Sequence, residues 1–209
     1  MPELRKDIIT REWVILAKER AKRPSDFVDA GSMGQDAVEH DPKCPFCLGN
    51  EAMTPPEIFS DRAAHLPANS PGWQVRVMAN KFAALQSVGN LNRADYGIYE
   101  VMDGVGAHEV VVESPAHNKS IGQMETSQVE RVIGAYLARF NALRQDPRLG
   151  YILIFRNHGK VAGSSLTHPH SQIVATPVIP QKVLAKVKGV TIQGIPREMS
   201  LLRYPVIRA

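Results

Sequence analysis

Several classes of protein are excluded by what this 209-residue sequence lacks. No apolar run reaches the roughly 18 residues that a membrane-spanning helix needs. The first residues, MPELRKDIITREW, lack the apolar segment of a secretory signal. The formal net charge is only +4, from 25 basic and 21 acidic residues, so charge alone indicates a small phosphorylated ligand as readily as nucleic acid. We therefore expect a cytoplasmic protein with no membrane partner.

An α+β fold is predicted by the order of apolar patterns. Hydrophobic residues make up 44% and charged residues 22%, which is typical of a globular chain of one large domain. One helix is expected over residues 126–146, where a capping box of Ser127 and Glu130 is followed by apolar residues at helical spacing. The expected strands lie in EWVIL, WQVRVM, GIYEVM, AHEVVVES, LGYILIFRN and HSQIVATPV, with GIYEVM and AHEVVVES pairing across DGVG and LGYILIFRN buried.

The only two cysteines, Cys44 and Cys47, form the stretch CPFC. In a cytoplasmic protein, such a pair favours a metal or redox site over a structural disulfide. Two thiolates on one turn make half of a common zinc site. Thioredoxin-like chemistry would need a helix after the pair, and LGNEAMTPPE is a poor helix. A buried, inert thiol pair is the remaining alternative.

The stretch GSSLTHPHSQ is poor material for a protein core. On an extended strand, alternate side chains share a face, so His168, His170 and Gln172 would point one way. Pro169 cannot donate a ladder hydrogen bond, so it predicts an edge or a break at the start of this strand. The alternative is a solvated strand face.

Phosphoryl-group chemistry would suit this stretch. A neutral imidazole can attack phosphorus and hold a nucleotidyl group covalently, and Gln172 is placed to donate to the phosphate oxygens. Backbone N–H groups and hydroxyls near the phosphates are expected from Gly163, Ser164 and Ser165. Two more residues, in ERAKRP, are expected to clamp a diphosphate in the pocket of His170 or else to form a solvated basic turn: Arg20 and Arg23.

Four separated motifs follow one another along the chain: ERAKRP, CPFC, ESPAHNKS and SSLTHPHSQ. Motifs of this kind occur in the same order in the galactose-1-phosphate uridylyltransferase family, a branch of the histidine-triad superfamily, and the sequence resembles that family. The resemblance implies a histidine-triad-like antiparallel sheet with a long helix packed across it. It also implies uridylyl transfer from UDP-glucose to a hexose 1-phosphate, as in galactose metabolism, through a covalent histidine intermediate.

The resemblance also assigns individual residues. It implies that His170 is the nucleophile and that Gln172 contacts the phosphate. It implies a structural zinc ion held by Cys44, Cys47, His117 and His168. Because a metal-bound imidazole has committed its lone pair, His168 would then be unable to attack phosphorus. Around the nucleotide sugar the resemblance adds Asn80 and Asn157 to the residues already named: Arg20, Arg23, Gly163, Ser164 and Ser165.

Members of that family contain two similar halves, and the resemblance here covers the first. We interpret residues 1–180 as this N-terminal domain and residues 181–209 as an atypical or truncated tail. The sequence around CPFC also resembles adenylyl transferases that act on ADP-glucose, so the sequence leaves two alternatives for the nucleotide base, uracil and adenine. The expected partners are a nucleotide sugar and a sugar 1-phosphate, and a homodimer is compatible with the resemblance.

Two other functions compete with an enzyme. A non-catalytic module that binds zinc and a nucleotide is an alternative, because the second half is not in this sequence. A zinc-ribbon nucleic-acid binder fits least well, since the chain has no second Cys-x-x-Cys and no basic patch interleaved with aromatic residues.

Overall fold

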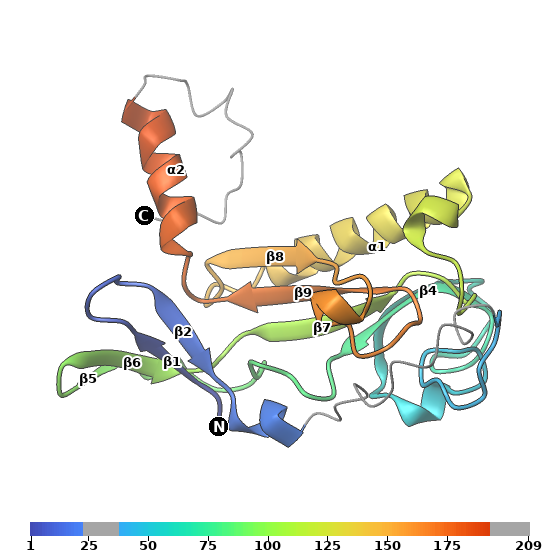
Figure 1. Ribbon diagram of the computed structural model, residues 1–209, viewed down its shortest axis with the longest axis horizontal. Helices are drawn as coiled ribbons and strands as arrows, with labels where there is room; N and C mark the ends of the chain where they lie inside the picture. Colours follow the sequence, from blue (N-terminus) through green and yellow to red (C-terminus); the bar gives the residue numbers. More distant parts are fainter. Residues whose placement is uncertain (23–37, 193–209) are drawn as a thin grey trace.

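The structure is a computed structural model that describes residues 1–22 and 38–192 (Figure 1). Two antiparallel sheets form its framework. The larger sheet has the strand order β3-β4-β7-β9-β8, and the smaller has the order β2-β1-β6-β5. The strands are β1 (Glu3–Lys6), β2 (Trp13–Leu16), β3 (Glu57–Arg62), β4 (Trp73–Ala79), β5 (Ala94–Tyr96), β6 (Tyr99–Asp103), β7 (Ala107–Val112), β8 (Tyr151–Phe155) and β9 (His170–Thr176).

One long helix, α1 (Thr126–Leu143), packs across the larger sheet, which confirms the predicted α+β class (Figure 1). A second helix, α2 (Gln181–Ile192), follows β9 and stands away from both sheets. Four short 3-10 helices complete the described elements: η1 (Lys18–Lys22), η3 (Glu51–Met53), η4 (Ile121–Gln123) and η5 (Lys160–Ala162). No helix within the two described ranges combines the length and apolar character that crossing a membrane requires.

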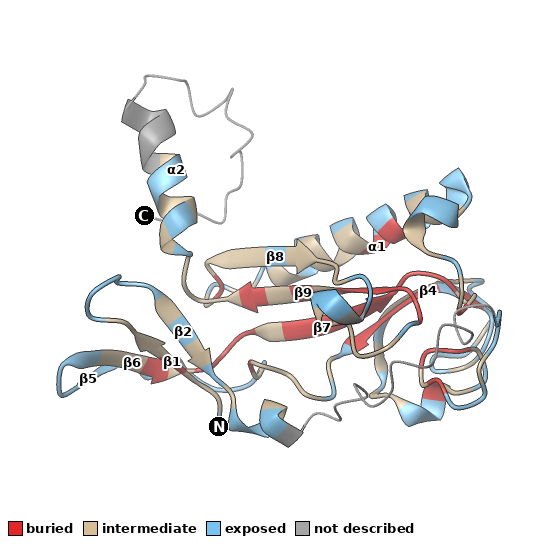
Figure 2. Ribbon diagram, in the orientation of Figure 1, coloured by how far each residue is buried: buried red, intermediate tan, exposed pale blue. Residues whose placement is uncertain are grey.

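Both faces of the larger sheet are buried at its centre, where β4, β7 and β9 lie (Figure 2). Val111 and Ile173 pack against Val132 and Ala135 of α1. Alternate residues of β7 face the other way, so Val110 belongs to a cluster that includes the two cysteines. Because successive strand side chains point to opposite faces, the consecutive residues Val110, Val111 and Val112 contribute to both clusters. This strand therefore joins the helix-covered core to the side that carries the candidate site.

The predicted hairpin of GIYEVM and AHEVVVES is wrong. Strand β6 pairs with β1 and β5 in the smaller sheet, whereas β7 pairs with β4 and β9 in the larger one. The DGVG segment crosses between the sheets in close contact with both. A Cβ atom at Gly104 would lie 2.6 Å from the backbone carbonyl carbon of Pro2, and one at Gly106 would collide with the carbonyl oxygen of Ala175. Glycine is required here by close approach, rather than by a hairpin turn.

Two smaller expectations are corrected, and for Pro169 one of the two expected alternatives, a break, is confirmed. Helix α1 begins at Thr126 with Glu125 at its N-cap and no side-chain cap, so the predicted capping box does not form. Strand β8 is an edge strand in which Leu153 is exposed, because only β9 pairs with it. Strand β9 lies between two neighbours and starts at His170, so Pro169 marks a break before an interior strand.

Candidate functional site

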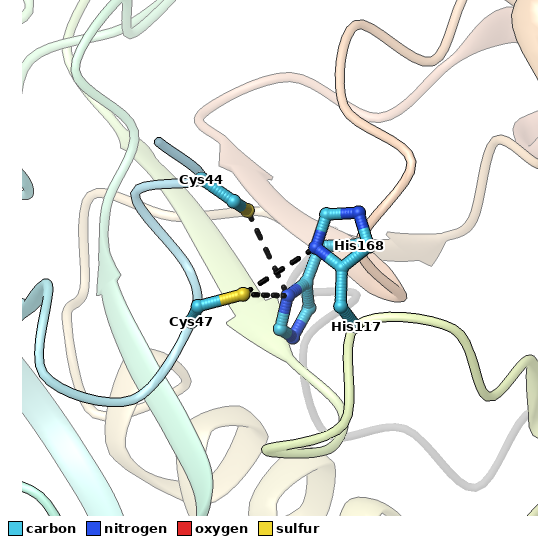
Figure 3. Close-up of side chains that lie close together, drawn as sticks. All are labelled: Cys44, Cys47, His117 and His168. Atoms are coloured by element: carbon cyan, nitrogen blue, oxygen red, sulfur yellow. Dashed lines mark hydrogen bonds between the residues drawn. The ribbon is translucent and has the colours of Figure 1, made fainter. Parts of the chain in front are cut away.

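Four metal-ligating side chains from three separate segments converge in the interior, as Figure 3 shows. Two come from the CPFC turn, one from the loop after β7 and one from the residue pair before β9. All four are buried, and their ligand atoms lie within 4.8 Å of one another: Cys44, Cys47, His117 and His168. The cluster could therefore hold a metal ion such as zinc.

The spacing of the ligand atoms fits a tetrahedral ion. Sγ of Cys47 lies 3.4 Å from Nδ1 of His117 and 3.6 Å from Nδ1 of His168, and Sγ of Cys44 lies 3.7 Å from the latter atom. Zinc bonds of about 2.3 Å to sulfur and about 2.0–2.1 Å to nitrogen would place tetrahedral ligands about 3.6 Å apart. The donor set and its dimensions both suit zinc.

Each histidine of the cluster is oriented by a hydrogen bond on its far side. Nε2 of His168 donates to the carbonyl oxygen of Ser114 at 2.8 Å, so Nδ1 carries the lone pair that faces the sulfurs. Nε2 of His117 lies 2.8 Å from the hydroxyl of Thr167. Partners of this kind fix the tautomer and ring orientation of metal-bound histidines.

Burial makes this cluster an unfavourable place for charge without a cation. It raises the pKa of the Cys44 thiol to about 12, with the nearby Cys47 contributing in the same direction. Burial also lowers the pKa of His168 to about 4, which favours the neutral imidazole. Neutral imidazole is the form that ligates metal, and a bound cation would offset the cost of the buried thiolates.

A cavity of about 360 Å³ opens beside this cluster. His170 and Gln172, which alternate on β9, both line it, as the shared strand face predicts. His168 does not, because it precedes the strand and turns toward the cysteines. The expected sharing of one face by all three residues is therefore wrong for His168. The predicted site residues in the cavity lining are Arg20, Asn80, Ser165, His170 and Gln172.

The tautomer of His170 is set by a backbone carbonyl just before its strand. Nδ1 lies 2.8 Å from the backbone carbonyl oxygen of His168, which can only accept a hydrogen bond. Nδ1 therefore carries the proton of the neutral ring, and Nε2 carries the lone pair. The ring of Phe46 packs edge-on against His170, with a centroid separation of 5.4 Å, and it also lies 6.0 Å from the ring of His168. Phe46, one of the two residues between the cysteines, thus packs against both histidines.

Arg20 reaches the cavity from η1, about 150 residues before His170 in the sequence. Its Nη1 donates to the carbonyl oxygen of Phe82 at 2.9 Å and lies 3.3 Å from Nδ1 of His108. The arginine is therefore held at the same cavity as His170, as expected. Arg23 lies outside the described residues.

Three further expected residues lie outside the cavity lining. Asn157 follows β8, and Gly163 and Ser164 lie just after η5. The hydroxyl of Ser164 donates to the carbonyl oxygen of Leu166 at 2.8 Å, so it closes its own turn. Gly163 has a φ of +80°, which a residue with a side chain rarely adopts. The loop between β8 and β9 therefore brings Ser165 to the cavity, while these three lie farther back.

Sequence reasoning missed several residues at the cavity. Lys43 and Lys81 line it and add positive charge, and Phe46 and Phe82 supply aromatic surface. Three of these stand directly beside residues that the motifs had singled out, so adjacency to CPFC and to Asn80 was the available signal. Phe46 lies inside CPFC, where only the cysteines were considered, and the other three lie outside the motifs.

Comparisons with known proteins agree with this arrangement. Residues 1–180 match the family described as galactose-1-phosphate uridyl transferase, N-terminal domain. ADP-glucose phosphorylase of Arabidopsis thaliana is 36% identical over 192 residues, covering 90% of this chain and 52% of that protein. Galactose-1-phosphate uridylyltransferase of Thermotoga maritima is 29% identical over 191 residues, covering 90% and 50%.

Solved structures give the same result. The crystal structure of the Arabidopsis thaliana ADP-glucose phosphorylase with bound ADP-glucose matches with a TM-score of 0.60 at 33% identity, over 92% of this chain and 54% of that one. A structure of uridylyltransferase matches with a TM-score of 0.67 at 26% identity, over 95% and 53%. This chain therefore spans about half the length of these relatives.

The fold and the site define an α+β protein that combines antiparallel sheets, a long helix and a histidine-bearing cavity. Within that class, the chain belongs to the galactose-1-phosphate uridylyltransferase family of nucleotidyltransferases, through its N-terminal domain.

Proposed function

We propose that this chain carries the nucleotidyl-transfer site of an enzyme that moves a nucleoside monophosphate group from a nucleotide sugar to a phosphate-containing acceptor. The proposal rests on the position and the tautomer of His170. It lines a cavity, and its Nδ1 proton is committed to the carbonyl oxygen of His168, so the lone pair of Nε2 is the nucleophile. Arg20 and Gln172 line the same cavity and would face the phosphates.

The proposed reaction has two balanced steps. Nε2 of His170 attacks the α-phosphorus of the nucleotide sugar, and the bond from that phosphorus to the bridging oxygen breaks. The sugar 1-phosphate leaves with the electron pair, and the nucleotidyl group stays on His170. A phosphate oxygen of the acceptor, a hexose 1-phosphate in the uridylyl-transfer case, then attacks the same phosphorus and regenerates the histidine. Negative charge on the equatorial oxygens would be met by donors such as the amide of Gln172 and the guanidinium of Arg20.

Zinc is proposed as a structural ion. A closed site with four protein ligands has no open position for substrate, so the ion would supply folding energy and hold its segments together. The cysteine turn carries Phe46, which packs against His170. Residue His168 carries the carbonyl that fixes the tautomer of His170. Binding of zinc would thereby stabilise the position of the nucleophile.

Two donors are proposed, and one is favoured. UDP-glucose follows from the family to which the chain belongs. ADP-glucose is favoured by a specific observation: identity is 36% to ADP-glucose phosphorylase and 29% to the Thermotoga maritima uridylyltransferase, over nearly the same length. With ADP-glucose the transferred group is adenylyl, and the chemistry at His170 is unchanged.

The test is covalent labelling. The 209-residue chain is incubated separately with UDP-glucose and ADP-glucose, each labelled at the α-phosphorus, and protein-bound label is measured after acid and after base treatment. A phosphoramidate on histidine should be lost in acid and kept in base. The donor that labels the chain more efficiently identifies the preferred nucleotide base, uracil or adenine. Absence of label from both donors, in a folded zinc-loaded chain, would contradict the proposal.

A non-catalytic module that binds zinc and a nucleotide is the second candidate. It is favoured by the length comparison, because the chain spans about half of its relatives. This candidate predicts nucleotide-sugar binding by calorimetry with no covalent label. The labelling experiment therefore separates the two functions directly.

A further inference from the structure

His108 is a buried polar side chain behind the cavity lining, where it contacts the lining residues Arg20, Asn80 and Gln172, and none of the sequence motifs includes it. It stands near the start of β7, opposite Val174 of β9, and is 5% exposed. Two residues further on, Val110 stands opposite Gln172, and both line the cavity. Since alternate residues share a strand face, His108 lies on the same face as the cavity.

The donors around Nδ1 of His108 determine where its proton is. The backbone N–H of Ala84 points at Nδ1 from 3.0 Å, and Nη1 of Arg20 lies 3.3 Å away. A backbone N–H and a guanidinium can only donate, so Nδ1 must accept. The neutral ring therefore carries its proton on Nε2.

This proton in turn determines the orientation of the Gln172 amide. Nε2 of His108 lies 2.8 Å from Oε1 of Gln172, and a ring N–H must be paired with an acceptor. Asn80 gives the same answer independently. Its Oδ1 accepts from the backbone N–H of Phe82 at 2.9 Å, so its Nδ2 is the group that lies 3.4 Å from Oε1 of Gln172. The same Nδ2 also lies 3.2 Å from Nε2 of His108, and because both nitrogens carry protons in this assignment, Oε1 of Gln172 is the acceptor on which the two donors converge.

We propose that His108 is a positioning residue: it holds the carbonyl oxygen of Gln172 through Nε2–H, so that the amide NH₂ of Gln172 is turned to the cavity beside His170. The consequence for catalysis rests on the proposed function. An NH₂ group beside the transferred phosphate stabilises its charge, whereas a flipped amide would present an oxygen and repel it. The orientation is set before substrate arrives, because all of its donors belong to the protein.

Two conservative variants separate positioning from simple packing. In H108Q the amide nitrogen can replace Nε2 and still donate to Gln172. In H108N the amide is shorter and can replace Nδ1, so it can still accept from Ala84 but cannot reach Gln172. If His108 only supports the turn at Ala84, H108N should retain the labelling rate better. We expect the reverse, with H108N slower than H108Q by about tenfold, the effect of one lost hydrogen bond of ordinary strength.

A double-mutant cycle tests the route of the effect. In the Gln172→Ala background, H108N should change the labelling rate by less than about twofold, because the group that His108 positions is gone. An undiminished tenfold loss in that background would overturn the inference. Zinc content and thermal unfolding of each variant show that the fold is intact.

The position of the proton on His108, on which the orientation of the Gln172 amide depends, can be measured without an activity assay. Nitrogen chemical shifts of the histidine rings, assigned to His108 by comparison with H108Q, should show Nε2 protonated and Nδ1 unprotonated in the unliganded chain. A proton on Nδ1 would overturn the inference whatever the labelling shows. If the wild-type chain takes no label and the Nε2–H tautomer is found, the proposed function fails and the orientation of Gln172 stands.

Discussion

Two histidines that stand two residues apart, His168 and His170, lie in different chemical surroundings. The Nδ1 atom of His168 faces two sulfurs in a closed cluster, and its Nε2 donates to the carbonyl oxygen of Ser114. The Nδ1 atom of His170 instead donates to a backbone carbonyl, and its ring lines a cavity. A backbone carbonyl thus pairs with Nε2 in His168 but with Nδ1 in His170.

The comparison shows how one residue type takes two roles. A backbone acceptor on Nε2 turns the Nδ1 lone pair of His168 toward the cysteines, where a metal ion could bind. A backbone acceptor on Nδ1 leaves the lone pair of His170 on Nε2, which suits nucleophilic attack. The acceptor for His170 is the backbone carbonyl of His168. A hydrogen bond therefore connects a residue of the closed cluster to a residue of the open cavity.

Replacement of each histidine by alanine should have the largest effects and should distinguish the roles of the two residues. His170→Ala should abolish covalent labelling and leave zinc content and thermal unfolding close to those of the wild-type chain. His168→Ala should lower zinc content first and labelling only as a consequence. Labelling by donor nucleotide and metal analysis of the same preparations check both. Persistent labelling of the His170→Ala chain would show that another group is the nucleophile.

Loss of a cysteine should affect the fold more than the cavity. Cys44→Ala should remove zinc and lower the free energy of unfolding by several kcal/mol, since structural zinc contributes its binding energy to folding. Thermal unfolding and metal analysis measure the effect.

Thr167→Val is a graded control for that experiment. It removes the hydroxyl beside Nε2 of His117 and keeps all four ligands, so zinc affinity should fall by about 10- to 100-fold with a smaller loss of stability. A Cys44→Ala chain with unchanged zinc content and unfolding temperature would contradict the structural role.

Removal of the amide donor should affect only the cavity. Gln172→Ala should slow labelling by about 10²-fold, by analogy with the loss of a single oxyanion donor, and leave zinc content unchanged. Rapid-quench measurement of the labelling rate checks this. An equal loss of zinc and labelling would mean that Gln172 supports the fold rather than the reaction.

The smallest effect concerns the face of β9 opposite the cavity, where Glu113 is buried. Burial raises the pKa of this carboxyl, and the charge of Arg156, 3.1 Å away, only partly opposes the shift. The folded state therefore holds the proton more tightly than the unfolded state. This contribution to stability is complete below the carboxyl's ordinary pKa and is lost as pH rises through the raised pKa.

Glu113→Gln removes that titration. The wild-type chain should lose stability relative to the variant as pH rises through this range, while the labelling rate at fixed pH changes little. Urea unfolding at several pH values measures the difference. A difference in stability that is independent of pH, or that changes in the opposite direction, would contradict the assignment.

The sequence predicted the site better than the strand pairing, and the reason is distance along the chain. Cys44 and Cys47 lie on one turn, and His170 and Gln172 alternate on one strand, so local spacing suffices to bring each pair together. The contribution of His117 came from family resemblance, since a single loop histidine has no local signal. The pairing of GIYEVM was predicted wrongly because one of its partners, β1, lies almost a hundred residues earlier, and the other, β5, was not predicted as a strand.

His108 shows why positioning residues are harder to find. Its strand, AHEVVV, carries two adjacent polar residues, His108 and Glu109, and nothing in this pattern distinguishes the histidine. Its importance depends on Ala84, Arg20 and Gln172, which come from three other segments. Only the assembled structure shows that donors on one side of the ring determine the proton on the other.

The central claim is that the Nε2 atom of His170 forms the covalent bond to the nucleotide. The most direct measurement is to locate the label in the unmutated chain, by digestion under mildly basic conditions and fragmentation mass spectrometry of the peptide that contains both histidines. We expect a nucleoside monophosphate on His170 and an unmodified His168. Attachment to His168, or to any residue outside the cavity, would contradict it.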